Sequence, residues 1–258
     1  MNRSLWIAAT GMECQQLKAD TVANNMANVN TDGYKRSTVH FQDMLYQQVG
    51  SPGATNANGN ATAGQQIGSG ARTVSVTKDF MQGSLHNSSS PLDFAVEGNG
   101  FFEVELTDGS SAYTRTGNFH LNSSGQVVTS DGYLVNNFPT LNPRASSIDV
   151  APDGTVSQTV DGATTQVGTI QLARFANAEG LRCLGHSLYA ETEASGAPTR
   201  GTPGTNSIGQ VAQNFLESSN VEIVSEMIDM IAAQRAYELL SKSIKSASDM
   251  LRTANNVA

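Results

Sequence analysis

The residues whose spacing is most suggestive of catalysis are Ser75 and Lys78, which stand as Ser-x-x-Lys in this sequence of 258 residues. In penicillin-binding enzymes this motif supplies the acylated serine, together with a Ser-Asp-Asn and a Lys-Thr-Gly motif. The sequence contains neither companion motif. Residues 73–77 also alternate in polarity as a strand does, whereas the acylated serine stands at the start of a helix. We therefore expect no acyl transfer at Ser75.

Sites for metals and phosphates are also incomplete. Four histidines are scattered along the chain without the spacing of metal ligands: His40, His86, His120 and His186. Residues 28–33 resemble the start of an EF-hand loop. Such a loop needs a carboxylate at position one and a glutamate at position twelve, where this chain has Asn28 and Val39. Residues 98–100 read Gly-Asn-Gly without the Gly-Lys-Ser/Thr of a phosphate loop, so we expect a tight turn into a strand there.

The remaining reactive side chains favour structural roles. Glu103 and Glu105 share one face of an expected strand, where paired carboxylates usually form a solvated surface. Cys14 and Cys183 have no Cys-x-x-Cys partner, so both are expected to be inert packing residues. We predict no catalytic residue, no bound metal, no cofactor and no small-molecule substrate.

The charge and hydropathy of the chain exclude further classes of protein. A formal net charge of −8 argues against a surface for nucleic acid or anionic membrane. No run of about 18 apolar residues is present, so no segment is expected to span a bilayer. The apolar patch of residues 5–9 is too short for the core of a secretory signal, and we expect no cleaved signal peptide.

The element that must organise the fold is an expected helix at the C-terminal end. Residues 216–258 contain no Gly or Pro and have apolar side chains three and four residues apart. Ser219 and Glu222 stand as a capping box, which predicts that the helix begins there. A helix of some 35 residues is roughly 50 Å long. Its predicted apolar row is Ile223, Met227, Met230, Tyr237, Leu240, Ile244 and Leu251.

A second helix is expected at the other end of the chain, over residues 4–29. It runs into Asn-Thr-Asp-Gly, where Gly33 can take the left-handed conformation that closes a helix. Its predicted apolar row is Leu5, Ala8, Met12, Ala19, Val22, Met26 and Val29.

The two helices are expected to pair antiparallel and to leave apolar surface uncovered. Val224, Ile228, Ile231 and Leu239 lie beside the C-terminal row, so this face is wider than one partner helix covers. Large uncovered apolar faces usually mark contact with another chain. We therefore predict that both rows form an assembly interface. Because isolated amphipathic helices are marginal in water, we also predict that the termini become ordered only on assembly.

The middle of the chain has the pattern of a β domain. Residues 50–70 are Gly-rich and uncharged, as in a flexible linker or a long loop. From about Arg72 to Thr192 the apolar period is two. Four Asp-Gly pairs predict tight hairpins: residues 108–109, 131–132, 153–154 and 161–162. This indicates a compact antiparallel domain, a small barrel or a sandwich.

The predicted fold class is therefore α+β with three regions. Long terminal helices, in residues 1–30 and 217–258, form a coiled-coil-like core domain. Residues 31–79 and 193–216 form an extended connecting region that includes the Gly-rich segment. Residues 80–192 form a β-rich outer domain.

Several motifs resemble those of one known family. They are ANNMANVNTDGYKR at 23–36, PLDFAVEGNGFFEV at 91–104, AYTRTGNF at 112–119, LESSNV at 216–221 and QRAYE at 234–238. Their order and their spread along the chain make it similar to the rod and hook axial proteins of the bacterial flagellum. Members usually have Gly two residues before the Leu-Glu pair, where this chain has Asn214.

The resemblance implies a structural role. Family members polymerise helically, with terminal helices inside a hollow tube and β domains outside, and the asparagines of the first motif would make polar contacts among the packed helices. The nearest likeness is to distal-rod members, which implies a drive shaft that transmits torque from motor to hook. The implied partners are further copies of the chain, neighbouring rod and hook proteins, the L/P-ring bushing and the flagellar type III export apparatus. The implied location is the basal-body rod, which spans the periplasm.

Two alternatives stay open. A proximal-rod or hook member of the same family is one, although the Gly-rich segment favours the distal rod and a hook subunit would carry a larger outer domain. A β-rich surface adhesin would account for the middle of the chain, but not for two matched terminal helices.

Overall fold

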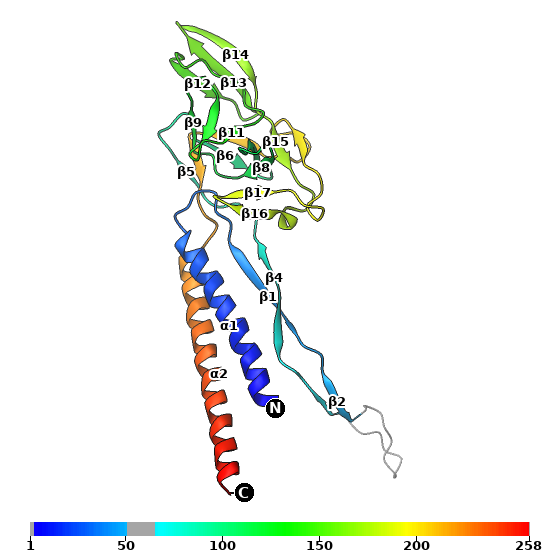
Figure 1. Cartoon of the computed structure of the whole chain (residues 1–258). Coiled ribbons are helices and arrows are strands. Elements are labelled where there is room, and N and C mark those ends of the chain that lie inside the picture. Colours follow the sequence, from blue (N-terminus) through cyan, green and yellow to red (C-terminus); the bar gives the residue numbers. More distant parts are fainter. Residues whose placement is uncertain (1–2, 51–64, 258) are drawn as a thin grey trace. The chain divides into compact units, whose positions relative to one another are not determined.

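The chain divides into two compact units that are joined by four crossings of the backbone. The computed structural model describes residues 3–50 and 65–257 (Figure 1). Unit 1 comprises Met1–Ala27, Ser37–Thr77 and Glu222–Ala258, and unit 2 comprises Asn28–Arg36 and Lys78–Val221. Helices occur at the two ends of the chain and antiparallel sheets between them, which confirms the predicted α+β class.

Unit 1 is built on a pair of helices, α1 (Arg3–Ala27) and α2 (Ile223–Val257). The two run antiparallel, side by side (Figure 1). They approach closely at Gly11, where an added Cβ would lie 3.1 Å from a methyl carbon of Leu240. The antiparallel pairing predicted from the sequence is confirmed. No helix in the described part of the chain is long and apolar enough to cross a membrane.

Ser219 and Gly33, the two residues predicted to mark helix ends, have other roles in the structure. α2 begins at Ile223, and the Ser219 hydroxyl accepts a hydrogen bond from the Val221 N–H (3.3 Å), so the predicted capping box is wrong. Gly33 is left-handed (φ +67°) but follows the end of α1 by six residues. An added Cβ there would lie 2.8 Å from the backbone nitrogen of Thr116, so this glycine permits a close approach within unit 2.

A long β-hairpin completes unit 1. β1 (Ser37–Asp43) pairs with β4 (Ala71–Lys78), and β2 (Gln47–Gly50) pairs with β3 (Gln65–Ile67). Gly70 has φ +111°, and an added Cβ would lie 2.3 Å from the Thr10 hydroxyl oxygen, so the hairpin comes very close to α1 here. Of the segment 50–70 that we expected to be a linker, both ends belong to this hairpin, and residues 51–64 lie outside the described residues.

Unit 2 contains the remaining strands, and every pairing among them is antiparallel. One sheet has seven strands in the order β16-β17-β8-β7-β11-β10-β9, a second has the order β12-β13-β14, and three strand pairs join β15 to β18, β19 to β6 and β20 to β5. Within unit 2, all of which is described, no pairing joins β9 to β16, so the largest sheet is open. The strands are β5 (Leu85–Asn87), β6 (Phe94–Glu97), β7 (Phe102–Glu105), β8 (Ser111–Thr114), β9 (Phe119–Leu121), β10 (Val127–Thr129), β11 (Leu134–Val135), β12 (Ser147–Val150), β13 (Thr155–Val160), β14 (Ala163–Thr169), β15 (Leu172–Arg174), β16 (Arg182–Gly185), β17 (Leu188–Ala190), β18 (Thr199–Gly201), β19 (Gln210–Gln213) and β20 (Phe215–Glu217).

All four predicted Asp-Gly hairpins are confirmed. The pairs lie between β7 and β8, β10 and β11, β12 and β13, and β13 and β14. In the last of them Asp161 and Gly162 have φ +50° and +81°, the two positive values that a type I′ turn needs. Residues 193–216, expected to be part of a connecting region, lie in unit 2 and carry β18, β19 and part of β20. The three predicted regions remain a prediction.

Unit 2 has its own hydrophobic core in two clusters. The larger one includes the fully buried rings of Phe94, Phe102 and Phe119. The smaller one gathers Phe101, Tyr113, Phe175 and Tyr189, with ring centroids 4.7–6.1 Å apart in edge-on arrangements. Such pairs add to the free energy of area burial, so unit 2 has an apolar core independent of the helices.

Candidate functional site

The lysine with catalytic spacing is held by structural contacts. Ser75 lies within β4, a strand as predicted. The Lys78 ammonium donates a hydrogen bond to the Lys35 carbonyl oxygen (2.9 Å) and lies 4.2 Å from the centroid of the Tyr34 ring. Burial lowers the pKa of Lys78. These contacts account for the lysine without an acylated serine.

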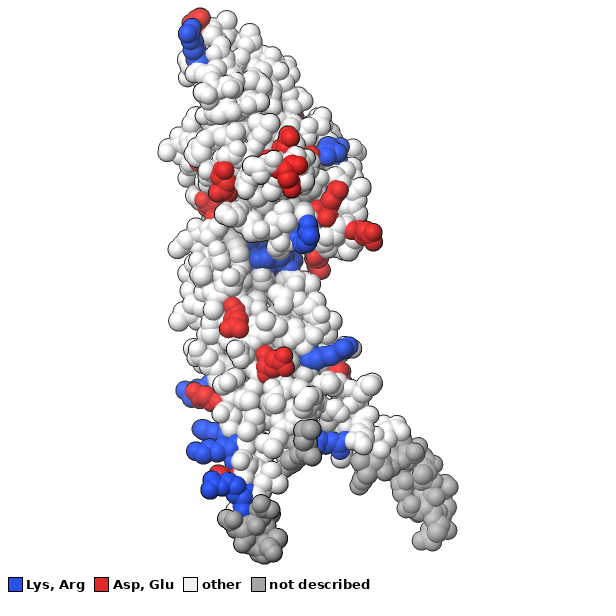
Figure 2. Space-filling view, in the orientation of Figure 1, with Lys and Arg blue, Asp and Glu red and all other residues white. Residues whose placement is uncertain are grey.

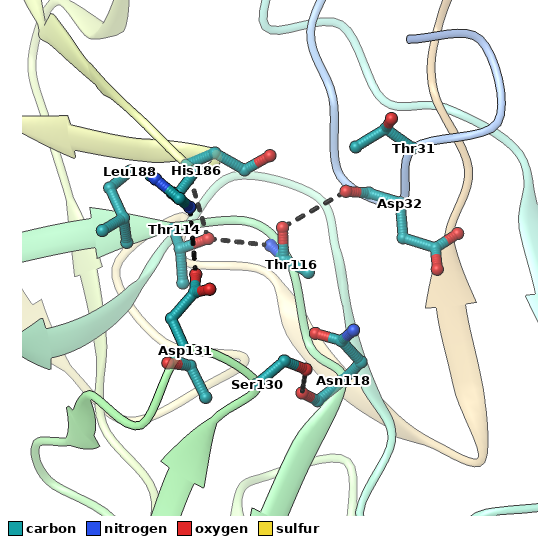
Figure 3. Close-up of a pocket in the computed structure, with 11 residues that line it drawn as sticks. Thr31, Asp32, Thr114, Thr116, Asn118, Ser130, Asp131, His186 and Leu188 are labelled. Atoms are coloured by element: carbon teal, nitrogen blue, oxygen red, sulfur yellow. Dashed lines mark hydrogen bonds and ion pairs between the residues drawn. The ribbon is translucent and has the colours of Figure 1, made fainter.

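A polar pocket of about 240 Å³ in unit 2 contains a histidine beside an aspartate (Figure 3). Nδ1 of His186 lies 3.5 Å from a carboxylate oxygen of Asp131. The Thr114 hydroxyl also lines this pocket. It donates a hydrogen bond to the Ser187 carbonyl oxygen (3.0 Å) and accepts one from the Thr116 N–H (3.1 Å). A nucleophilic hydroxyl has to donate its proton to the base, and this hydroxyl donates to the backbone. The pocket therefore brings His186 beside Asp131, but the proton of its Thr114 hydroxyl is already donated to a backbone carbonyl and not to the histidine.

Glu103 and Glu105 lie in different surroundings, so the expectation that both are solvated is wrong. Glu103 is buried and accepts two hydrogen bonds from Arg200 (2.7 and 2.9 Å) and one from Ser111 (3.0 Å). The hydrogen bonds from Arg200 hold the pKa of Glu103 below its ordinary value. Glu105 is exposed. Glu103 is thus half of a structural ion pair between β7 and β18.

The two cysteines also differ. Cys14 is buried in α1, as expected of a packing residue, but Cys183 in β16 is exposed and that expectation is wrong for it. Desolvation of the sulfur raises the pKa of the Cys183 thiol, which disfavours the reactive thiolate at neutral pH.

The seam between α1 and α2 contains polar residues. Gly11, Lys18 and Asn25 meet α2 and are spaced by seven residues, each one position before a member of the predicted apolar row. The Lys18 ammonium lies 2.9 Å from a carboxylate oxygen of Asp229, and the Asn25 amide donates to the Glu226 carboxylate (3.2 Å). Asn25 and Glu226 are both buried. Buried polar contacts of this kind select one register of a helix pair.

Asn25 also anchors the hairpin of unit 1. Its side-chain oxygen accepts a hydrogen bond from the Ser37 N–H (2.9 Å), and its amide donates to the Ser37 carbonyl oxygen (2.9 Å). One buried side chain therefore ties α1 to α2 and to the start of β1. The resemblance implied that the asparagines of this motif make polar contacts among packed helices, and Asn25 does so within its own chain.

The fourteen residues predicted as an assembly interface occupy three kinds of environment. Ala8 and Val22 are buried. Eight are half-buried: Leu5, Met12, Ala19, Met26, Val29, Met230, Leu240 and Ile244. Four are exposed: Ile223, Met227, Tyr237 and Leu251. The buried and half-buried members of the helices are covered at least in part within the chain, so their role between copies remains a prediction.

Large apolar side chains are exposed mainly on unit 1. Of the nineteen such side chains in the described residues, sixteen belong to unit 1. On α2 they include Val224, Ile228 and Leu239, with 65%, 63% and 66% of their surfaces exposed. Ile228 follows the buried Glu226 by two residues, about 200° around the helix. α2 therefore has an apolar face directed away from α1.

The hairpin of unit 1 carries the second exposed apolar group. Val74 and Val76 alternate with half-buried neighbours along β4, and Leu45 and Tyr46 follow β1. Leu45 is the most exposed of them, at 91%. Both elements of unit 1 thus present apolar side chains to solvent in a single chain.

Few charged residues occupy the face shown in Figure 2. Basic side chains gather over the C-terminal part of α2, which contains Lys242, Lys245 and Arg252, while acidic ones are scattered over both units (Figure 2).

A buried ion-pair cluster in unit 2 was not predicted from the sequence. The Lys35 ammonium lies 2.7 Å from one carboxylate oxygen of Glu217, and Nε of Arg115 lies 3.2 Å from the other. All three side chains are nearly inaccessible to solvent. Burial lowers the pKa of Lys35, and the neighbouring charge of Arg115 lowers it further, while Glu217 raises it. Each residue lies within a different motif that carried the family resemblance, but spacing alone could not reveal that they meet.

The departure at Asn214 has a simple geometric explanation. Asn214 has φ +61°, the left-handed conformation in which glycine is unstrained and asparagine is the best-tolerated alternative. Its backbone is held on both sides, because its N–H donates to the Asp93 carbonyl oxygen (2.9 Å) and its carbonyl accepts from the Ser88 N–H (2.7 Å). The position therefore keeps the geometry of a glycine turn with a different residue.

Three family models match the chain. The model described as flagella basal body rod protein matches residues 5–35, the flagellar hook protein FlgE/F/G D1 domain matches residues 95–158, and the flagellar basal body rod FlgEFG protein C-terminal model matches residues 212–257. These ranges contain most of α1 together with Lys35, the β7–β8 hairpin, and Glu217 with α2.

Individual proteins match over nearly their full length. The flagellar basal-body rod protein FlgG of Buchnera aphidicola subsp. Schizaphis graminum is 44% identical over 255 residues, which cover 96% of this chain and 97% of that protein. FlgG of Caulobacter vibrioides is 42% identical over 259 residues, with 99% of each chain covered. The flagellar basal-body rod protein FlgF of the same bacterium is 30% identical over 258 residues, which cover 98% of this chain and 97% of that protein.

Proposed function

Because the chain belongs to the flagellar basal-body rod protein family, we propose that it is a structural subunit of the distal rod, polymerising helically into a hollow shaft that transmits torque from motor to hook. Within Caulobacter vibrioides the identity is 42% to FlgG, the distal-rod protein, and 30% to FlgF. This difference favours the distal rod over the alternative, a proximal-rod or hook paralogue.

The observation that carries the proposal is the exposed apolar surface of unit 1. A helical polymer needs two different surfaces on each subunit that fit each other, since a repeated head-to-tail contact generates an open filament. The α2 face around Ile228 and the hairpin side chains around Leu45 and Val74 supply apolar surface on two elements of one unit. Contiguous exposed apolar surface marks sites of protein contact, and the polymer covers it with neighbouring subunits.

The finer features of the proposal follow from this role. The location is the basal body, in the part of the rod that spans the periplasm, and export proceeds through the flagellar type III apparatus. Neighbouring rod and hook proteins contact the two ends of the polymer, and the L/P-ring bushing surrounds it. Catalysis has no part in this proposed function. The side chains of Lys78, Thr114 and Glu103 are each hydrogen-bonded within the chain, to a backbone carbonyl oxygen or to Arg200.

A substitution on the exposed face of α2 tests the proposal without disturbing the helix pair. Ile228→Asp places a charge on a side chain that is 63% exposed, whereas Met230 is half-buried and Val22 is buried, so an aspartate at either position would also disturb packing within the chain. In concentrated solutions of the full chain, we expect the parent to form polymers visible by electron microscopy and Ile228→Asp to form at least about tenfold fewer, since burying an unpaired charge costs several kcal/mol.

Ser243→Asp is the matched control, because Ser243 is an exposed polar residue of the same helix that belongs neither to the predicted apolar row nor to the exposed apolar side chains. It adds the same charge without removing apolar surface, so we expect polymers as in the parent. A parent chain that stays monomeric at every concentration would falsify the proposed function. Equal polymerisation of Ile228→Asp and the parent would remove the α2 face from the interface.

A further inference from the structure

The four crossings between the units adjoin three segments of unit 2. The backbone crosses after Ala27, Arg36, Thr77 and Val221. The adjoining segments of unit 2 are residues 28–36, 78–84 and 217–221. Because each crossing continues directly from one of these segments, the positions of the segments determine where every crossing leaves unit 2.

Glu217, the first residue of the third segment, contacts both of the other segments. Its backbone oxygen accepts a hydrogen bond from the Gly33 N–H (2.7 Å), and its carboxylate accepts from the Gly83 N–H (2.9 Å). The same carboxylate pairs with the Lys35 ammonium (2.7 Å), which donates in turn to the Met81 carbonyl oxygen (2.7 Å). The second segment follows the first by about 50 residues and the third follows it by about 180, yet all three meet at the buried side chain of Glu217.

Asn220 makes a second joint among the same segments. Its side-chain oxygen accepts from the Arg36 N–H (2.7 Å), and its amide donates to the carbonyl oxygens of Asp79 (2.9 Å) and Met81 (3.1 Å). The Asp79 N–H donates to the Arg36 carbonyl oxygen (2.8 Å), which joins the first two segments directly. Most of these bonds end on backbone atoms, so they determine the path of the chain itself.

The charges in this cluster are a poor source of stability. Lys35 and Arg115 bring two cations to one carboxylate in a site closed to solvent, and desolvation offsets much of their attraction. Unit 2 already has two apolar clusters built on other residues. Buried ion pairs are often replaced by apolar residues without loss of stability, but apolar residues do not direct hydrogen bonds to chosen backbone atoms.

We propose that Lys35, Arg115, Glu217 and Asn220 form a registration clamp, which sets the positions of the crossing segments for assembly rather than stabilising the core of unit 2. The clamp is a set of positioning residues, since it acts through the segments that lead to α1, the hairpin and α2. The proposal rests on the proposed rod function, because its main readout is the order of the polymer.

An apolar replacement of the charged part separates registration from stability. In the full chain, the triple variant Lys35→Met, Arg115→Met, Glu217→Leu removes every charge of the cluster and keeps its volume. The variant leaves the Gly83 N–H and the Gly100 carbonyl oxygen without these partners, at a cost of about 1 kcal/mol each, so we expect the urea midpoint of unit 2 to fall by no more than about 1 M. Backbone amides of the three segments are expected to exchange with solvent about tenfold faster, because losing one hydrogen bond lowers the free energy of local opening by about 1 kcal/mol. The polymers are expected to lose regular order in electron micrographs.

Asn220→Ala tests the uncharged joint and does not depend on repacking a buried site, because Asn220 is only half-buried. We expect the same faster exchange and the same loss of polymer order. The control is Glu103→Leu with Arg200→Met, which removes the ion pair between β7 and β18. It is expected to leave polymer order and segment exchange as in the parent.

The outcomes separate the two proposals. Regular polymers from both clamp variants, while the parent also polymerises, would overturn the clamp and leave the rod function intact. Unfolding of the unit 2 core in the triple variant, together with regular polymers from Asn220→Ala, would identify the cluster as a stability element and overturn the clamp as well. Absence of polymers from the parent would instead refute the rod function, and unchanged segment exchange in Asn220→Ala would then still count against the clamp.

Discussion

The tightest approach to a glycine in unit 2 is at Gly117, in the Thr-Arg-Thr-Gly motif. An added Cβ would lie 1.6 Å from the Phe94 carbonyl oxygen, whereas ordinary contact begins at about 3.4 Å. The strand β6 would have to move by more than an ångström. Phe94 is fully buried, and its N–H donates to the Gly117 carbonyl oxygen (3.0 Å), so this shift would break a hydrogen bond and displace a core ring. Overpacking and the lost bond together predict that Gly117→Ala lowers the free energy of unfolding by about 3–4 kcal/mol.

Gly109→Ala separates this steric effect from backbone strain. Gly109 lies in a hairpin turn with φ +79°, and nothing lies within 4 Å of an added Cβ. An alanine there is strained only by its backbone conformation, which costs about 1–2 kcal/mol.

Urea unfolding of the full chain measures both variants. The near-ultraviolet circular dichroism of the buried rings Tyr113 and Tyr189 reports unit 2, since both lie in its smaller core cluster. With an m value of about 2 kcal/mol/M, we expect the midpoint to fall by about 1.5–2 M for Gly117→Ala and by less than about 1 M for Gly109→Ala. Equal midpoints for the two alanine variants would refute the argument from the contact with Phe94.

Two further predictions concern unit 2. Because Asn214 is left-handed, Asn214→Gly should leave the urea midpoint nearly unchanged, whereas Asn214→Val should lower the free energy of unfolding by about 1–3 kcal/mol; equal midpoints for the two would count against a strained backbone. Hydrogen bonds from Arg200 hold the pKa of Glu103 below its ordinary value, so the stability they supply is present above the unfolded-state pKa of about 4.3 and is lost as pH falls through the folded-state pKa. The midpoint difference between parent and Glu103→Gln should therefore be constant from pH 6 to 8 and shrink below about pH 4, and a difference that grows with acid would contradict this.

Local patterns in the sequence predicted most of the elements, because their causes lie within a few residues. The four Asp-Gly turns needed only a residue pair that tolerates positive φ between two strands. The helices needed only apolar spacing over residues 4–29 and 216–258. The family resemblance then connected these elements to a rod protein, and the full-length relatives agree with it.

The sequence did not predict contacts between distant residues or the competition among local signals. Lys35, Arg115 and Glu217 are far apart in the chain, and a charged residue within a motif looks the same whether it is buried or solvated. Ser219 had the right spacing for a helix cap, but its hydroxyl accepts a hydrogen bond from the Val221 N–H. Spacing predicted the apolar row of α1, but it did not show that Gly11, Lys18 and Asn25, each one position before a member of that row, also contact α2.

The composition of that seam bears on whether the helices are ordered in a free subunit. Among the residues of α2 whose burial is described, the buried ones are Glu226, Ala233 and Ala247, and the buried residues of α1 are Ala8, Cys14, Val22 and Asn25. Apart from Val22 these are small or polar side chains, which bury little apolar area, so this contact stabilises a helix pair weakly while its polar groups select the register.

The large apolar side chains of α2, such as Ile228 and Leu239, are exposed in the single chain, and in the proposed polymer other copies cover them. We therefore expect the dilute monomer to show fast amide exchange over residues 4–29 and 220–254 and slow exchange in the core of unit 2. In the polymer the helices should become as protected as that core, since assembly supplies the missing apolar burial. Slow exchange throughout both helices in a dilute monomer would show that the seam alone orders them, and the exposed face of α2 would then be free to dock without any coupled folding.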